Sequence, residues 1–191
     1  FALPEVKLGL LPGGGGTQRL PRQIGLQKSL NMMLTGSNLY ARQALKLGLV
    51  DELTHHHKLH QAAKTLAKKM LAGTWKPKKP KKSIANRFLE NTPIGRNIVF
   101  SQARKMAMKQ SQGNYPAIPA ILDTIETGYK KGITAGYDKE LEYFEKLMLT
   151  PQSKALRSLF FLSNDKKKNP LPNLVKPINT LGMRNKIQLH S

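Results

Sequence analysis

Apolar residues recur at helical spacing along most of the chain, and lysine-rich or proline-rich segments separate these apolar stretches. In the segment 26–35, Leu26, Leu30 and Met33 fall on one helical face, and Gly36 follows as a helix end. The same spacing predicts further helices over residues 41–47, 58–72, 84–90, 93–110, 116–131, 137–148 and 153–162. The chain is therefore expected to be predominantly helical.

Signals for extended structure are few. Residues 1–16 predict a short strand or extended segment that runs into a glycine-rich turn, and Thr17 is expected to cap the helix that follows. A second extended piece begins at residues 49–50, and a strand is expected to start within 178–181. The predicted fold class is mainly α with minor β.

Two segments interrupt the helical pattern. Residues 73–82 place two prolines among lysines, which excludes a helix or a central strand and predicts a solvated linker. Residues 164–177, rich in Lys, Asn and Pro, predict a second linker. The helices therefore fall into one group before the first linker and a second group between the two linkers.

The composition narrows the class of protein. The 191 residues carry a net charge of +21, from 32 Lys and Arg against 11 Asp and Glu, and the charge is spread along the chain. This distribution favours a generally basic protein over a dedicated nucleic-acid tail. The absence of Cys excludes disulfides and thiolate metal sites. The chain opens on Phe1 in an apolar segment, without Met or a secretory signal, and residues are therefore expected to precede it.

Glu5 is the first candidate for chemistry because it stands just before the glycine-rich turn at residues 12–16. Water addition to an activated double bond needs a base for the water's proton and an acid that protonates carbon, and paired carboxylates can do both. Backbone N–H groups in a glycine turn can hold a water or an enolate oxygen. A single glutamate before glycines is more often an ordinary surface residue, so these residues alone leave both interpretations open.

Several segments in register resemble the crotonase (enoyl-CoA hydratase/isomerase) family. Residues 3–22 are similar to its signature, in which Pro-Glu, Leu-Gly and Pro-Gly-x-Gly-Gly-Thr-Gln-Arg-Leu follow in order, and residues 34–50 match its next two elements. Residues 112–157 resemble the linker of multifunctional fatty-acid oxidation alpha subunits, the bacterial form above all. There a hydratase is joined to an NAD-dependent 3-hydroxyacyl-CoA dehydrogenase.

The resemblance implies roles for particular residues. Glu5 matches the family's second catalytic glutamate, which exchanges a proton with the α carbon, and the Gly13 N–H matches the donor that helps hold the catalytic water. Gly15 and Gly16 are expected to shape the turn, and Arg19 and Arg22 to support the following helix. The family's first catalytic glutamate and both oxyanion-hole amides lie upstream of the Pro-Glu motif, so the chain alone is expected to be inactive.

The resemblance also implies an architecture: part of the crotonase spiral followed by a helical linker region. The expected parts are 1–75, the end of the hydratase core; 76–82, a basic linker; 83–163, linker helices packed on the core; and 164–191, a flexible tail that ends at the start of a truncated dehydrogenase domain. The implied function is hydration of trans-2-enoyl-CoA in bacterial cytoplasmic β-oxidation, with acyl-coenzyme A as substrate and a thiolase beta subunit as partner. No tightly bound cofactor is expected, and NAD belongs to the dehydrogenase alone.

Three other interpretations remain open. His55, His56, His57 and His60 raise the question of a metal site, but adjacent histidines point in different directions, so a loop and no metal are expected. The lysines of 76–82 could bind polyanions, although Trp75 is the sole nearby aromatic and no nucleic-acid partner is expected. The chain could also be a non-catalytic helical interaction module or a truncated gene product, prone to self-association.

Overall fold

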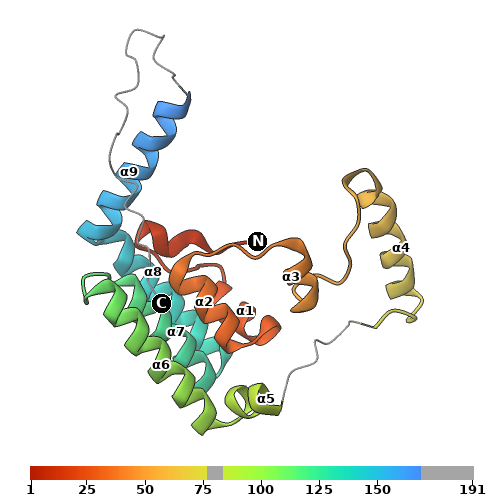
Figure 1. Ribbon diagram of the computed structural model, residues 1–191, viewed down its shortest axis with the longest axis horizontal. Coiled ribbons are helices and arrows are strands. Elements are labelled where there is room, and N and C mark those ends of the chain that lie inside the picture. The colour runs from red at the N-terminus through yellow and green to blue at the C-terminus, as the bar shows by residue number, and fades with distance from the viewer. Residues whose placement is uncertain (77–83, 169–191) are drawn as a thin grey trace, which may run out of the picture. The chain divides into compact units, whose positions relative to one another are not determined.

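The computed structural model describes residues 1–76 and 84–168, and in these ranges it contains helices and no strand (Figure 1). The elements are η1 (Pro4–Leu8), α1 (Gly16–Ile24), α2 (Leu26–Thr35), α3 (Ala41–Lys46), η2 (His56–Lys58), α4 (Leu59–Leu71), α5 (Ile84–Asn91), α6 (Pro93–Ser111), α7 (Ala117–Lys130), α8 (Ile133–Leu149) and α9 (Pro151–Lys168). The mainly helical prediction is confirmed. The strand expected at 178–181 and nearly all of the basic linker lie outside the described residues.

Local signals in the sequence account for several helix boundaries. α2 ends at Gly36, whose left-handed backbone (φ 61°) lets its N–H return to the Met32 carbonyl. α6 begins after Thr92, whose hydroxyl accepts the Gly95 N–H at 3.0 Å. α9 begins in the same way, because the Thr150 hydroxyl accepts a hydrogen bond from the Ser153 N–H at 3.2 Å. These boundaries follow from capping residues that can be recognised in the sequence.

The opening segment differs from its prediction. Residues 4–8 form the 3-10 helix η1, which ends at Gly9 (φ 70°), and residues 1–3 and 10–12 lie outside regular secondary structure. Proline suits the first position of a helical turn, since it needs no N–H bond there, and glycine readily adopts the left-handed conformation that ends the turn. Phe1 exchanges two hydrogen bonds with Leu39, at 2.8 and 2.7 Å, the pairing that an extended segment would make. Residues 49–50 form a bend.

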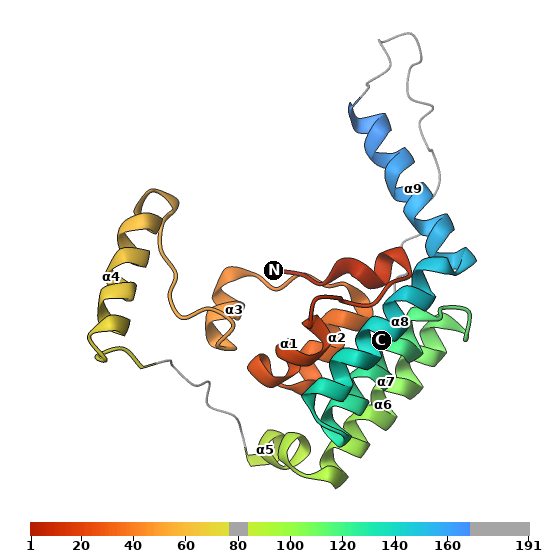
Figure 2. The same cartoon turned by 180° about the vertical axis from the view of Figure 1, so that it is seen from behind.

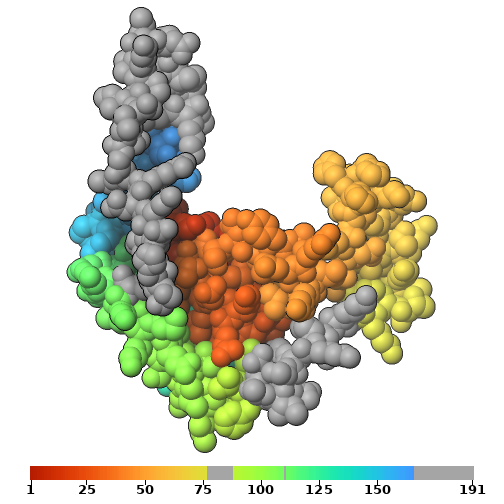
Figure 3. Space-filling view, viewed as in Figure 1, coloured from red at the N-terminus to blue at the C-terminus, as the bar shows by residue number. Residues whose placement is uncertain are grey.

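The chain divides into two compact units, Phe1–Arg157 and Ser158–Ser191. In the first unit α6, α7 and α8 lie side by side, and α1 and α2 pack against them (Figures 1 and 2). The surface of α2 meets that of α6 in the space-filling view (Figure 3). In the second unit the described residues, 158–168, are helical. The four-part division expected from the sequence stays a prediction.

One apolar core joins the glycine-rich segment to the helices that follow residue 92. Leu11, Leu26 and Met33 are fully buried, and so are Ile121 and Leu122 on α7. Burial of each such side chain contributes about 1.5–3 kcal/mol. The segments that resemble the family signature and those that resemble its linker therefore form one folded body.

Gln18 occupies the point where α1, α7 and α8 meet. Its side-chain amide is fully buried and donates to the Thr124 carbonyl at 3.0 Å and the Thr17 hydroxyl at 3.1 Å. Gly128 on α7 and Gly136 on α8 both face this amide, and a Cβ at either position would overlap it. The two glycines thus make room for a polar side chain that ties three helices together.

We predict that Gly136→Ala lowers the free energy of unfolding by about 1–2 kcal/mol, because the overlap with Gln18 outweighs the gain in helix propensity. Urea denaturation followed by circular dichroism measures the loss. In a Gln18→Ala background the same substitution should cost much less, since the space is then open. An equal cost in both backgrounds would contradict this account.

Candidate functional site

η1 places Glu5 beside the start of the buried core. The Leu10 N–H donates to the Glu5 carbonyl at 3.0 Å, and the Tyr115 hydroxyl donates to the neighbouring Val6 carbonyl at 2.7 Å. Burial raises the pKa of Tyr115 above its ordinary value, against a smaller lowering by the Gly9 N–H, so the hydroxyl keeps its proton and stays a donor. Tyr115 thereby anchors the short helix that carries Glu5.

One oxygen of the Glu5 carboxylate, Oε2, is buried without a hydrogen-bond partner within the described part of the chain. A buried carboxylate oxygen without a donor is costly, and native proteins retain few of them.

The glycine-rich turn leads from this region into α1. Gly14 and Gly15 adopt positive φ angles of 63° and 83°, which other residues rarely tolerate. Gly13 is exposed, and its N–H has no acceptor among the residues that the structure describes. Its carbonyl accepts the Gly16 N–H at 3.2 Å. The Gly13 N–H thus lacks a protein partner in this part of the chain, and its role in holding a water stays a prediction.

The cap of α1 comes from a distant helix, so the prediction that Thr17 caps it is wrong. Glu140 on α8 accepts the Gly15 N–H at 2.6 Å and the Thr17 N–H at 3.1 Å, and it also accepts the Thr17 hydroxyl. Thr17 lies inside the helix, so its hydroxyl is a donor to the cap. A carboxylate at the N-terminal end of a helix accepts hydrogen bonds from the free N–H groups there, and its negative charge interacts favourably with the positive end of the helix dipole.

A cavity of about 430 Å³ lies between the glycine-rich turn and α8. It is lined by Gly13, Gly14, Gly15, Arg19, Tyr137, Glu140, Leu141 and Phe144. The Phe144 ring lies 3.4 Å from where a Gly13 Cβ would stand. Glu5 is not part of this lining, and no hydrogen bond in the described part of the chain joins Glu5 to Gly13. The structure thus places the two predicted site residues on separate parts of one segment.

The two arginines of the signature, Arg19 and Arg22, make contacts that support α1, as expected. Arg22 donates to the Gly128 carbonyl at 2.8 Å, and its guanidinium lies 5.0 Å from the centre of the Tyr129 ring. Burial raises the pKa of Tyr129, while Arg22 and Arg96 oppose that shift. Arg19 donates to the Gly14 carbonyl. Arg22 therefore joins α1 to α7, and Arg19 holds the outer side of the turn.

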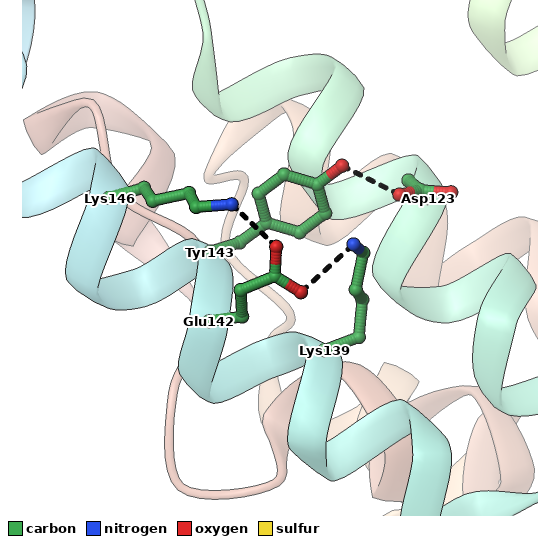
Figure 4. A network of polar contacts seen from close by, with 5 residues as sticks. All are labelled: Asp123, Lys139, Glu142, Tyr143 and Lys146. Atoms are coloured by element: carbon green, nitrogen blue, oxygen red, sulfur yellow. Dashed lines mark hydrogen bonds and ion pairs between the residues drawn. The ribbon is translucent and has the colours of Figure 1, made fainter.

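Polar contacts on α8 include one bond to α7 and two bonds within α8 (Figure 4). The Tyr143 hydroxyl donates to Asp123 at 2.7 Å, and this bond is the main reason that the pKa of Tyr143 is raised. Glu142 accepts from Lys146 at 2.5 Å and from Lys139 at 3.0 Å. These bonds, with Lys146 first, lower the pKa of Glu142, and the bond to Glu142 raises the pKa of Lys139.

The histidines form no metal site that the structure can identify. The rings of His55 and His57 stack with centroids 5.7 Å apart, and both side chains are exposed. Across residues 1–76 and 84–168, no group of three His, Cys, Asp or Glu side chains could hold a metal ion. Within the same ranges, no helix has the length and apolar character needed to cross a membrane.

Sequence reasoning missed Glu140, Gln18 and Tyr115 as site-forming residues. A signal for Glu140 was present, because it shares one helical face of α8 with the buried residues Gly136 and Leu147. A glutamate on an otherwise buried face implies a specific hydrogen-bonding partner. No signal identified the partner, which lies more than 120 residues away along the chain.

In this helical body, a Pro-Glu segment and a glycine-rich turn lead into a capped helix. The same segments identify the protein family. Residues 1–112 match the family described as enoyl-CoA hydratase/isomerase, and the chain belongs to this family. It is also 52% identical over 168 residues to the "Fatty acid oxidation complex subunit alpha" of Shewanella loihica strain PV-4. The proteins of that name from Shewanella baltica strain OS155 and Shewanella putrefaciens strain CN-32 are 49% identical over the same length. Each match covers 88% of this chain and 23% of the relative.

We predict that Tyr143→Phe lowers the free energy of unfolding by about 1–2 kcal/mol, because it leaves the Asp123 carboxylate without its donor. Thermal or urea unfolding measures the change. Tyr137→Phe is the matched control, since Tyr137 lies on the same helix and its hydroxyl forms no hydrogen bond in the described part of the chain. Equal losses in the two variants would contradict the role of the hydrogen bond.

We predict that Glu142 titrates below the ordinary pKa of a glutamate, and that Lys146→Met raises its pKa toward that value. Because the folded pKa is the lower one, the bonds contribute stability above the ordinary glutamate pKa and lose it as the pH falls through the depressed value. Carbon-detected NMR titration of the Glu142 side chain checks both statements. An unchanged pKa in the Lys146 variant would refute the assigned cause.

Proposed function

We propose that this chain forms part of a hydratase module that adds water to trans-2-enoyl-CoA, with Glu5 as one of its two catalytic glutamates. The observation that carries the proposal is the buried Oε2 atom of Glu5, which has no partner in the described part of the chain. Membership of the enoyl-CoA hydratase/isomerase family supports the same reaction class. The chain spans 23% of the length of the relatives it matches, so the activity of a whole protein is itself part of the proposal.

In the proposed reaction, the hydroxyl of water adds to the β carbon and a proton adds to the α carbon. One carboxylate takes a proton from the water, and another gives a proton to carbon, so no proton is left over. Glu5 exchanges the proton with the α carbon, and the open Gly13 N–H holds the water. The other glutamate and the oxyanion donors belong to the part of the family fold that precedes the Pro-Glu segment.

The proposed substrate is an acyl-coenzyme A thioester, and no tightly bound cofactor is needed for hydration. The net charge of +21 supports attraction of the coenzyme A phosphates. NAD would serve a dehydrogenase domain and is assigned no site in this chain. The printed name of the relatives, subunit alpha of a fatty acid oxidation complex, supports a second subunit as partner. We propose that this partner is a thiolase beta subunit and that the complex is located in the bacterial cytoplasm.

The second candidate is a non-catalytic helical interaction module. One observation favours it: Leu159, Phe160, Phe161 and Leu162 are consecutive residues of α9 whose exposed fractions range from 48% to 63% in the described structure. Large apolar side chains in such a run are suited to association with another protein or another copy of the chain. This candidate needs neither Glu5 nor the Gly13 N–H.

We predict that Glu5→Gln lowers kcat/KM for crotonyl-CoA hydration about 100- to 10,000-fold, the usual contribution of a general acid or base. The assay uses the Shewanella loihica alpha subunit with its matching 168-residue segment replaced by that of this chain, so that the upstream part of the fold is present. Loss of the thioester-conjugated double bond is followed by absorbance. The 191-residue chain alone should show no turnover.

Glu52→Gln is the matched control, because Glu52 is exposed and lies outside the proposed site. It should leave kcat/KM unchanged. Full activity of the Glu5→Gln chimera would refute the catalytic assignment. A folded chimera without activity, together with concentration-dependent association of the chain alone, would favour the interaction module.

A further inference from the structure

Glu140 is a buried carboxylate whose partners all belong to the glycine-rich turn and the first turn of α1. It is 5% exposed and forms no ion pair in the described part of the chain. Burial of a carboxylate without a cation is costly unless strong hydrogen bonds replace its hydration. Gly15 and Thr17 supply three hydrogen-bond donors to the Glu140 carboxylate. These hydrogen bonds are the main reason that the buried carboxylate is tolerated.

Apart from the Arg19 bond to the Gly14 carbonyl, the turn itself has little that would order it. It contains four consecutive glycines, residues 13–16, which have more backbone freedom than any other residue type. Their side chains contribute no packing, so the shape of the turn depends on backbone contacts. The bond from the Gly15 N–H to Glu140 and the bond from the Gly16 N–H to the Gly13 carbonyl connect Gly13 to α8 in two steps.

A second residue of α8 acts on the same turn. The Phe144 ring lies 3.4 Å from the position of a Gly13 Cβ, one helical turn after Glu140. Glu140 therefore ties the end of the turn, and Phe144 limits the movement of its beginning. Between them Gly13 is exposed, and its N–H has no protein acceptor in the described structure.

We propose that Glu140 is a positioning residue for hydration, which holds the glycine-rich turn so that the Gly13 N–H is aimed at the catalytic water. This inference rests on the proposed function. Its physical basis is that a shift of about 1 Å in a catalytic donor can cost about 100-fold in rate. In this proposal α8 contributes to catalysis by positioning the turn, although none of its side chains touches the reacting atoms.

The direct test is amide hydrogen exchange of the full 191-residue chain, followed by NMR. Glu140→Gln should speed exchange of the Gly15 and Thr17 amides at least 10-fold, while amides in the middle of α7 keep their protection. Unchanged exchange at Gly15 and Thr17 would overturn the inference. An equal increase throughout α7 would overturn it as well, because it would show a general loss of stability.

The second test measures kinetics in the chimera that contains the upstream fold. Glu140→Gln should lower kcat 10- to 100-fold with KM for crotonyl-CoA nearly unchanged, because the water is misplaced while acyl-CoA binding is kept. Glu145→Gln is the control on the same helix, because Glu145 is exposed, and it should retain the wild-type kcat. A wild-type kcat in Glu140→Gln would overturn the inference even if Glu5→Gln is inactive. If Glu5→Gln is instead fully active, the proposed function fails, and the exchange result still decides whether Glu140 holds the turn.

Discussion

The hydrogen bonds between Glu140 and the N-terminal end of α1 are the constraint on which the rest of this structure depends. They join residues more than 120 positions apart and place a buried charge at the positive end of a helix. A buried charge of this kind tolerates little displacement, because its loss of hydration is compensated only at hydrogen-bonding distance. The packing of α8 against α1 is consequently specific in register and orientation.

Other features of the helical body make this contact possible. Gly128 and Gly136 lack the side chains that would displace Gln18, and α1 can therefore approach both α7 and α8 closely. Arg22 bonds to the Gly128 carbonyl on one side of this junction. The Tyr143–Asp123 bond holds α8 on α7 (Figure 4). The contact at Glu140 between α1 and α8 is thus supported by bonds that attach each of these helices to α7.

The position of η1 also depends on contacts with segments later in the chain. Tyr115 holds the Val6 carbonyl, and Ser153 at the start of α9 lies so close to Gly9 that a Cβ there would be 3.0 Å from the Ser153 Cα. The segments that resemble an interdomain linker in sequence therefore build the walls around the family's signature segment. Residues more than 100 positions after the Pro-Glu segment thus pack against it.

The sequence by itself determined the helices and much of their limits, because glycine ends such as Gly36 and caps such as Thr92 act on their own neighbours. It also determined the family, since a motif is a local pattern, and the same motif is the basis on which Glu5 and Gly13 are predicted to be site residues. Only the tertiary structure decided that Glu140, in place of Thr17, caps α1. The physical reason is that this cap depends on hydrogen bonds to a helix more than 120 residues away along the chain, which no local propensity or spacing encodes.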